Sequence, residues 1–195
     1  NKSLAGWVFQ NISNESLSIH EKMTLFWQNH FAVEESSDAR ATYYYYKLLR
    51  DNALGNFKDL VKKITINPSM LQFLNGNSNT KNSPNENYSR ELLELFSIGK
   101  GVQVGEGDYT NYTESDIKEG AKILTGWRID GVQSSISTKV NATFVPSKHD
   151  TTTKNLSSRL GNKVVVNGNE NEYANYIDIL FETDHAAQFI CKKLL

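Results

Sequence analysis

The sequence has little of what cross-links a chain, breaks its helices or anchors it in a membrane. Of its 195 residues, one is cysteine and three are proline. The single Cys191 excludes a disulfide within the chain and a metal site built from several cysteines. No apolar run approaches the roughly 18 residues of a membrane-spanning helix. We therefore expect no membrane span and a fold held together by packing.

An excess of charge of one sign is also missing. Lysine and arginine number 21 and aspartate and glutamate 22, which leaves a net charge of -1. Because the basic residues are scattered among acids, the sequence has no overall field for nucleic acid, and we expect no nucleic-acid partner. Hydrophobic residues make up 38% of the chain, enough for the core of one ordinary domain.

We expect a single helical domain over residues 1–195. The chain begins at Asn1 without an initiator methionine and ends at Leu195 inside an apolar helical pattern. Both features are typical of an internal fragment of a longer protein.

Hydrophobic residues recur at helical spacing over most of the chain. The predicted helices cover residues 19–31, 38–52, 57–66, 68–74, 84–98, 114–124, 172–181 and 183–195. Ser83, Pro84 and Glu86 predict the start of the fifth helix, and Thr113 with Asp116 the start of the sixth. Residues 140–145 and 163–166 are β-like. The fold class is therefore mainly α: a multi-helix orthogonal bundle with a small β-hairpin near residues 140–166.

The helix over residues 84–98 carries an unusual stripe. At about 100° per residue, Asn87, Glu91 and Glu94 share an arc of roughly 60°. The opposite, apolar side carries Tyr88, Leu92, Leu95 and Phe96. Two carboxylates three residues apart repel when both are ionised, so a cation, an arginine or a proton is expected beside them. The alternative is the solvated face of an amphipathic helix.

Two histidines and a run of tyrosines are the other candidates. His30 lies between aromatic residues, where a histidine is more often a core or boundary residue than a metal ligand. The pair His149-Asp150 follows a predicted strand, and it is either an oriented imidazole for a site or a simple turn. Tyrosines occupy positions 43–46, and four consecutive helical positions cannot all be buried. One or two should therefore be exposed and are candidates for a contact surface. The alternative is that the tyrosines serve ordinary packing.

Six segments, in this order along the chain, resemble those of a known protein family. They are KMTLFWQNHF (22–31), NALGNFKDLV (52–61), PSMLQFLN (68–75), PNENYSRELLELFSIG (84–99), YTESDIKEGAKILTGW (112–127) and the later HD with its KNL element. In these segments the chain resembles a large bacterial domain-of-unknown-function family, number 1800. The resemblance implies a mostly helical fold and, for many members, export to the periplasm or cell surface. It also implies genes that neighbour those of a sulfatase-like family, and no established activity.

The sequence departs from the family pattern at three places. The family usually has a second histidine at the position of Gln28, and a glycine at the position of Thr152. The family pattern then ends in a KxxLG-like segment, and the corresponding segment of this chain is longer and reads KNLSSRLG. A site that needs two histidines from the helix of His30 is therefore disfavoured, and the loop that presents His149 is expected to have a different shape.

Two functions compete. The first, which we rank higher, is an exported binding or assembly module in which Asn85, Asn87, Arg90 and Glu91 form a buried polar network. Its contact surface would include Tyr44 and Tyr45, and its partner would be another exported protein or a polysaccharide.

The second is a metal-assisted hydrolase. Its catalytic candidates are Glu91, Glu94, His149 and Asp150. The ligands of a divalent ion such as zinc, manganese or iron would be His30, Glu91 and His149. The sequence does not decide whether the protein is an enzyme.

Overall fold

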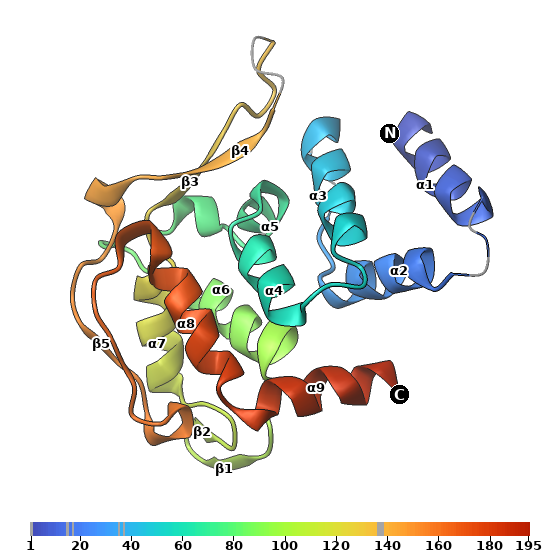
Figure 1. The fold of residues 1–195 in the computed structure, drawn as a ribbon. Helices are drawn as coiled ribbons and strands as arrows, with labels where there is room; N and C mark the ends of the chain where they lie inside the picture. Colours follow the sequence, from blue (N-terminus) through green and yellow to red (C-terminus); the bar gives the residue numbers. More distant parts are fainter. Residues whose placement is uncertain (1, 15, 17, 35, 37, 136–138) are drawn as a thin grey trace. The chain divides into compact units, whose positions relative to one another are not determined.

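The computed structural model describes residues 2–14, 16, 18–34, 36, 38–135 and 139–195, drawn in Figure 1. These residues form two compact units. The first unit consists of residues 1–73 and 129–142, and the second of residues 74–128 and 143–195. That they fold as one domain stays a prediction, as does the orthogonal arrangement of the whole bundle.

The described part of the first unit contains helices, the loops between them and strand segments at residues 129–130 and 141–142. Its helices are α1 (Lys2–Asn14), α2 (His20–His30), α3 (Ala39–Asp51), α4 (Phe57–Thr65) and α5 (Pro68–Phe73). Helix α2 packs on α1 and α3, and α5 packs on α3 and α4 (Figure 1). Four of the helices lie where the sequence predicts them. The sequence pattern does not predict α1, which packs through Trp7 on the edge of the Tyr43 ring, 5.4 Å away.

Aromatic rings fill the core of the first unit. The Trp27 and Phe57 rings stack 5.3 Å apart, and the Trp27 indole N–H donates to the Ala53 carbonyl at 2.8 Å. Helix α3 begins after Asp38, whose carboxylate accepts a hydrogen bond from the Arg40 amide at 3.0 Å. Such a cap satisfies one of the free amides at a helix start.

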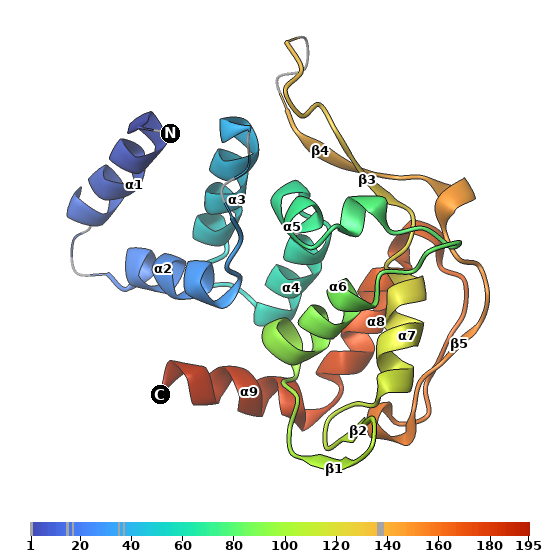
Figure 2. The same ribbon diagram turned by 180° about the vertical axis from the view of Figure 1, so that it is seen from behind.

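The second unit combines helices with short strands. Its α-helices are α6 (Glu86–Glu91), α7 (Glu114–Ile123), α8 (Glu172–Phe181) and α9 (Asp184–Leu194). Its other helical turns are η1 (Gly76–Ser78), η2 (Leu92–Ser97), η3 (Pro146–Lys148), η4 (Ser158–Leu160) and η5 (Asn169–Asn171). Helix α7 packs against α6, α8 and the segment that contains β5 (Lys154–Asn155), as Figures 1 and 2 both show.

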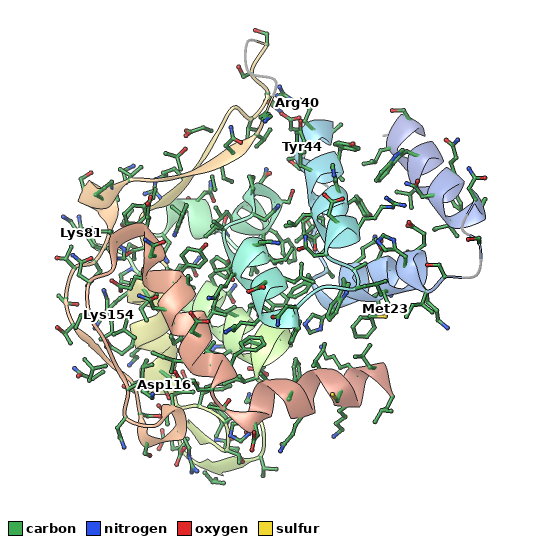
Figure 3. All side chains as sticks on the ribbon, viewed as in Figure 1. Met23, Arg40, Tyr44, Lys81, Asp116 and Lys154 are labelled. Atoms are coloured by element: carbon green, nitrogen blue, oxygen red, sulfur yellow. The ribbon has the colours of Figure 1, made fainter. Side chains whose placement is uncertain are left out.

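The start of α7 is the one the sequence predicts. The Thr113 hydroxyl accepts from the Asp116 amide, and the Asp116 carboxylate accepts from the Thr113 amide at 2.8 Å. The same carboxylate accepts from the Ser157 amide at 2.7 Å and the Ser157 hydroxyl at 2.6 Å. Asp116, labelled in Figure 3, therefore caps its own helix and also ties it to the chain after β5.

A small β-hairpin lies within residues 140–166 as predicted, but residues 140–145 and 163–166 do not pair with each other. The described strands form two-stranded sheets: β1 (Gln103–Gly105) with β2 (Asp108–Tyr109), β3 (Trp127–Asp130) with β4 (Asn141–Phe144), and β5 with β6 (Val164–Val165). Residues 140–145 thus pair with 127–130, and 163–166 with 154–155. In each sheet the two strands are consecutive in the chain, because a short loop costs less entropy to close.

The helix predicted over residues 84–98 is not uniform. Asn85, and not Ser83, is its cap, and a π-helical turn replaces the α-helix over Leu92–Ser97. There the Ile98 amide donates to the Leu93 carbonyl five residues back, at 3.1 Å. This wider turn rotates the following side chains. Leu95, predicted on the apolar side, is consequently 46% exposed.

None of the described helices combines the length and the apolar character that crossing a membrane requires.

Candidate functional site

Asn85 ties the loop before α6 to the helices of the second unit. Its side-chain oxygen caps α6 by accepting from the Tyr88 amide at 3.2 Å, and its side-chain nitrogen donates to the Leu74 carbonyl at 2.8 Å. Its own amide donates to the side chain of Asn79 at 2.9 Å, and buried Asn79 in turn donates to the Ala121 carbonyl at 3.1 Å. Asn85 therefore acts in the structure as a connector.

Arg90 joins α6 to α7. Its two terminal nitrogens donate to the two carboxylate oxygens of Glu114 at 2.7 and 2.8 Å, and Tyr109 donates to the same carboxylate at 3.2 Å. The Arg90 guanidinium lowers the pKa of Glu114, and Glu114 raises the pKa of Arg90. A two-pronged pair fixes both distance and orientation, so the contact sets how the two helices pack.

Glu91 and Glu94 behave as the sequence suggests for neighbouring carboxylates. Burial, and then the charge of Glu94, raise the pKa of Glu91, while Arg90 opposes them. Glu94 accepts from the Tyr112 hydroxyl at 2.9 Å and has the Lys100 ammonium at 3.7 Å. Glu94 thus has a cation and a phenol as compensation. Asn87, on the same predicted stripe, is exposed.

His149 is 1% exposed and lies inside the second unit. Its Nδ1 is 2.9 Å from the Thr125 carbonyl oxygen, and its Nε2 is 3.1 Å from a Glu172 carboxylate oxygen. Both ring nitrogens face hydrogen-bond acceptors. The Thr125 hydroxyl also lies 3.2 Å from Nδ1, so both ring nitrogens are engaged within the protein.

Glu172 and Lys154 complete this buried cluster. The Lys154 ammonium lies 2.5 Å from the second Glu172 oxygen and donates to the Asp150 carbonyl at 2.6 Å. Both side chains are fully buried, and Figure 3 shows Lys154 on the strand segment beside α7 and α8. We call Thr125, His149, Asp150, Lys154 and Glu172 the buried charge cluster. The cluster holds together β5, the first residue of α8 and the loop that carries His149 and Asp150, which we call the HD loop.

Sequence reasoning found His149 and Asp150 but not Thr125, Lys154 or Glu172. The available signal for Lys154 was the KNL element that accompanies the HD pair. Lysine is almost never fully buried without a partner. The partner of Lys154 is Glu172, 18 residues away, so the local pattern does not indicate that this lysine is buried.

Thr152 holds the carboxylate of Asp150. The Thr152 amide and hydroxyl both donate to one Asp150 oxygen, the amide at 2.9 Å. Burial acts to raise the pKa of Asp150, but these two bonds and the nearby Lys154 outweigh it, and the pKa is lowered. Thr152 therefore closes the loop that carries His149 and Asp150 on itself.

His30 lies in the aromatic core of the first unit. It is 8% exposed, with its ring edge-on to Phe31 at 4.4 Å and to Phe57 at 5.6 Å. Because Glu91 and His149 belong to the second unit, the convergence of His30 with them stays a prediction. Within the part of the chain that the structure describes, no group of three or more His, Cys, Asp or Glu side chains could hold a metal ion.

The tyrosine run divides as expected between core and surface. Tyr43 and Tyr44 are 36% and 37% exposed, with rings 5.4 Å apart. Tyr45 is buried, and its hydroxyl donates to the Phe31 carbonyl; Tyr46 accepts from Gln28 at 2.6 Å. The surface that α3 offers is thus formed by Tyr43 and Tyr44, the latter labelled in Figure 3, and not by Tyr45.

A groove that the sequence does not predict lies along α9. It encloses about 630 Å³ between residues 98–102, residues 110–111 and five side chains of α9, at positions 185, 188, 189, 192 and 193. We call it the α9 groove. Asn111 shapes its floor by donating to the carbonyls of Ile98 and Gly99 at 2.9 and 3.0 Å.

Two glycines in the groove wall adopt backbone conformations that other residues disfavour. Gly99 and Gly101 have φ of 72° and 71°, a region that side chains disfavour. A Cβ on Gly99 would lie 2.6 Å from the Phe189 ring, and one on Gly101 would lie 2.8 Å from Thr110. The absence of a side chain lets Gly99 lie against Phe189 of α9 and lets Gly101 lie against Thr110.

The family model described as "Protein of unknown function (DUF1800)" matches residues 1–195. The chain belongs to this family. The resemblance carried by the six sequence segments is therefore confirmed over the whole chain. Neither a curated protein nor a solved structure matches it.

Proposed function

We propose that this chain is a binding module and that the α9 groove is its ligand site. One observation carries the proposal: an open groove of about 630 Å³ whose lining combines the apolar side chains Ile98, Val102 and Phe189 with basic ones. Ligand pockets in proteins commonly measure about 300–1,000 Å³ and combine an apolar lining with a few polar groups. The groove has the size and composition that recognition of a small molecule requires.

The polar network around α6 supports this role by fixing one wall. The ion pair of Arg90 with Glu114 and the cap by Asn85 hold α6 on α7. The π-helical turn continues from α6, and Gly99 follows with its amide donating to the Leu93 carbonyl at 3.0 Å. A wall that is already ordered loses little entropy when a ligand binds, which favours affinity.

The chemistry of the HD loop fits a structural role better than a catalytic one. A catalytic base must come within hydrogen-bond reach of a substrate proton. His149 is 1% exposed and its two ring nitrogens are engaged by Thr125 and Glu172. The metal-assisted hydrolase that would use His30, Glu91 and His149 stays a prediction.

The proposal is tested with a neutral aromatic probe, naphthalene-2-carboxamide, titrated into the ¹⁵N-labelled protein. We expect amide shifts confined to residues 98–102, 110–111 and 185–193. The variant Phe189→Ala should weaken binding by about fivefold or more, because an aromatic contact is lost. Phe73→Ala, which removes a 39% exposed phenylalanine of the first unit, is the matched control. Shifts spread over the whole chain, or none with this probe or with charged probes of the same shape, would refute the proposal.

A second candidate is polysaccharide binding by Tyr43 and Tyr44, favoured by their exposure side by side on α3. Aromatic rings with an apolar face and a polar tip suit sugar rings. Titration of cellohexaose, chitohexaose and dextran against wild type, a Tyr43→Ala/Tyr44→Ala variant and the Phe73→Ala control tests it. An affinity equal in all three proteins would remove this candidate.

The site of action in this proposal is the periplasm or the cell surface, where the partner would be another exported protein or a polysaccharide. Family membership supports it, because the resemblance implies export for many members. Fractionation of cells that produce the complete protein tests it, and recovery in the cytoplasmic fraction alone would contradict it.

A further inference from the structure

The charges along the α9 groove all have one sign. Four basic side chains line it, Lys100, His185, Lys192 and Lys193, and no aspartate or glutamate is among the described lining residues. The sequence as a whole is balanced at -1, so this local excess of positive charge is a property of the fold.

Lys100 and Lys192 are weakly compensated by acidic side chains of the second unit. Lys100 has Glu94 at 3.7 Å, near the limit of an ion pair, and lies over the Tyr109 ring at 4.6 Å. His185 and Lys192 form no ion pair with the described residues of the second unit. Asp184 begins α9 but does not line the groove. An anion in the groove would therefore meet Lys192 without an ion pair and Lys100 with one only at the limit of distance.

Lys193 is partly removed from water. Its ammonium lies 4.5 Å from the centre of the Phe189 ring and 3.5 Å from the Leu95 carbonyl. Burial lowers the pKa of Lys193 because the charged form has lost part of its hydration. An anionic group nearby would replace that hydration and favour the charged form.

The apolar lining lies among these cations. Phe189 comes from the same face of α9 as His185, Lys192 and Lys193, and Val102, 74% exposed, comes from the opposite wall. No arginine is among the described lining residues. Arginine forks recognise carboxylate and phosphate alike, whereas lysines act as point charges. Lys192 forms no ion pair with the described residues of the second unit, whereas Lys100 already has Glu94 at 3.7 Å, so one available lysine charge matches a singly charged head.

We infer that the α9 groove binds a small organic carboxylate with an apolar body, its head paired with lysine and its body against Phe189 and Val102. This inference rests on the proposed function, since it names the ligand class of the same groove. The groove volume limits the ligand to a small molecule.

The test compares probes of nearly one shape and different charge. They are 2-naphthoate, the neutral naphthalene-2-carboxamide, the cationic 2-naphthylmethylammonium and 2-naphthyl phosphate. We expect naphthoate to bind about fivefold more tightly than the carboxamide, the gain typical of one partly exposed ion pair. The cation should bind most weakly. Raising the salt concentration from 50 to 500 mM should reduce the affinity for naphthoate and leave that for the carboxamide unchanged.

Single variants locate the charge. Lys100→Gln and Lys192→Gln should each lower naphthoate affinity toward that of the carboxamide, while carboxamide binding shows that the groove is still folded. Lys122→Gln is the matched control, since this lysine of the second unit pairs with Glu119 at 2.7 Å and does not line the groove.

The outcomes separate the two claims. Equal affinity for naphthoate and carboxamide would overturn the carboxylate inference and leave the groove as a binding site. Tighter binding of the phosphate than of naphthoate would overturn the assignment of a singly charged head. Failure of all four probes would refute the proposed function itself.

Discussion

The buried charge cluster allows a quantitative test of what holds the second unit together. Lys154 and Glu172 are fully buried and 2.5 Å apart, between Nζ and Oε1. Lys154→Met keeps a chain of similar length and removes the charge. It leaves Glu172 with the imidazole of His149 at 3.1 Å and the Gly168 amide at 3.1 Å. A carboxylate that relied on a buried ammonium is then only partly compensated.

Removing one partner of a buried ion pair typically costs about 3–5 kcal/mol, since the remaining charge stays away from water. In a chain of this size each kcal/mol lowers Tm by roughly 2–4 °C. We therefore expect Lys154→Met to lower Tm by roughly 6–20 °C. The double variant Lys154→Met/Glu172→Gln, which removes both charges, should recover about half of that loss, because the uncompensated charge is gone.

Calorimetry measures the transitions, and hydrogen exchange of α7 and α8 assigns the loss to the second unit. The matched control is Lys163→Met. Its ammonium lies 2.7 Å from Glu182, but both side chains are about half exposed, and such pairs contribute about 0–1 kcal/mol. If Lys154→Met destabilised the protein no more than Lys163→Met, the assignment of a structural role to the buried pair would be wrong.

Three further predictions follow from single residues. Gly99→Ala should weaken naphthoate binding at least fivefold and lower stability by about 1 kcal/mol or more. The reasons are the positive φ of Gly99 and the added Cβ, which would lie 2.6 Å from the Phe189 ring. Gly105→Ala is the control and should change neither quantity, because its Cβ would meet no atom closer than 3.8 Å. Arg40 lowers the pKa of Asp38 well below its usual value, so the stability this carboxylate adds is complete above about pH 4 and is lost as the pH falls. Acid unfolding of Asp38→Asn should therefore show a smaller pH dependence than wild type, and an equal dependence would contradict this. Elemental analysis of protein purified without chelator tests the metal-ligand prediction: stoichiometric metal that is lost in both Glu91→Gln and His30→Ala would support it, and metal-free wild type would count against it.

Local signals in the sequence determined most of the helices. The Thr113 and Asp116 cap starts α7 as predicted, because both hydrogen bonds lie within four consecutive residues. Apolar spacing located α3 and α4 to within about a residue, since each helix must bury one stripe. The expectation that one or two of four tyrosines reach solvent also needs only helical geometry, and two of them do.

The tertiary structure decided which polar residues act together. The sequence placed Glu94 on a charged stripe, but only folding brings Tyr112 and Lys100 to it. It identified the HD pair, but the ion pair of Lys154 with Glu172 joins positions that no local pattern relates. Long-range pairing depends on how packed elements meet, and that is set by the burial of the whole core and not by the neighbours of any one residue.

The α9 groove also arises from the packing of elements that are distant in the sequence. Its basic residues come from two stretches of chain about 85 residues apart, and neither stretch is unusual in charge when taken alone. Helix periodicity and caps act over a few residues, so they can be recognised in the sequence; a concave surface exists only after distant elements have packed beside one another.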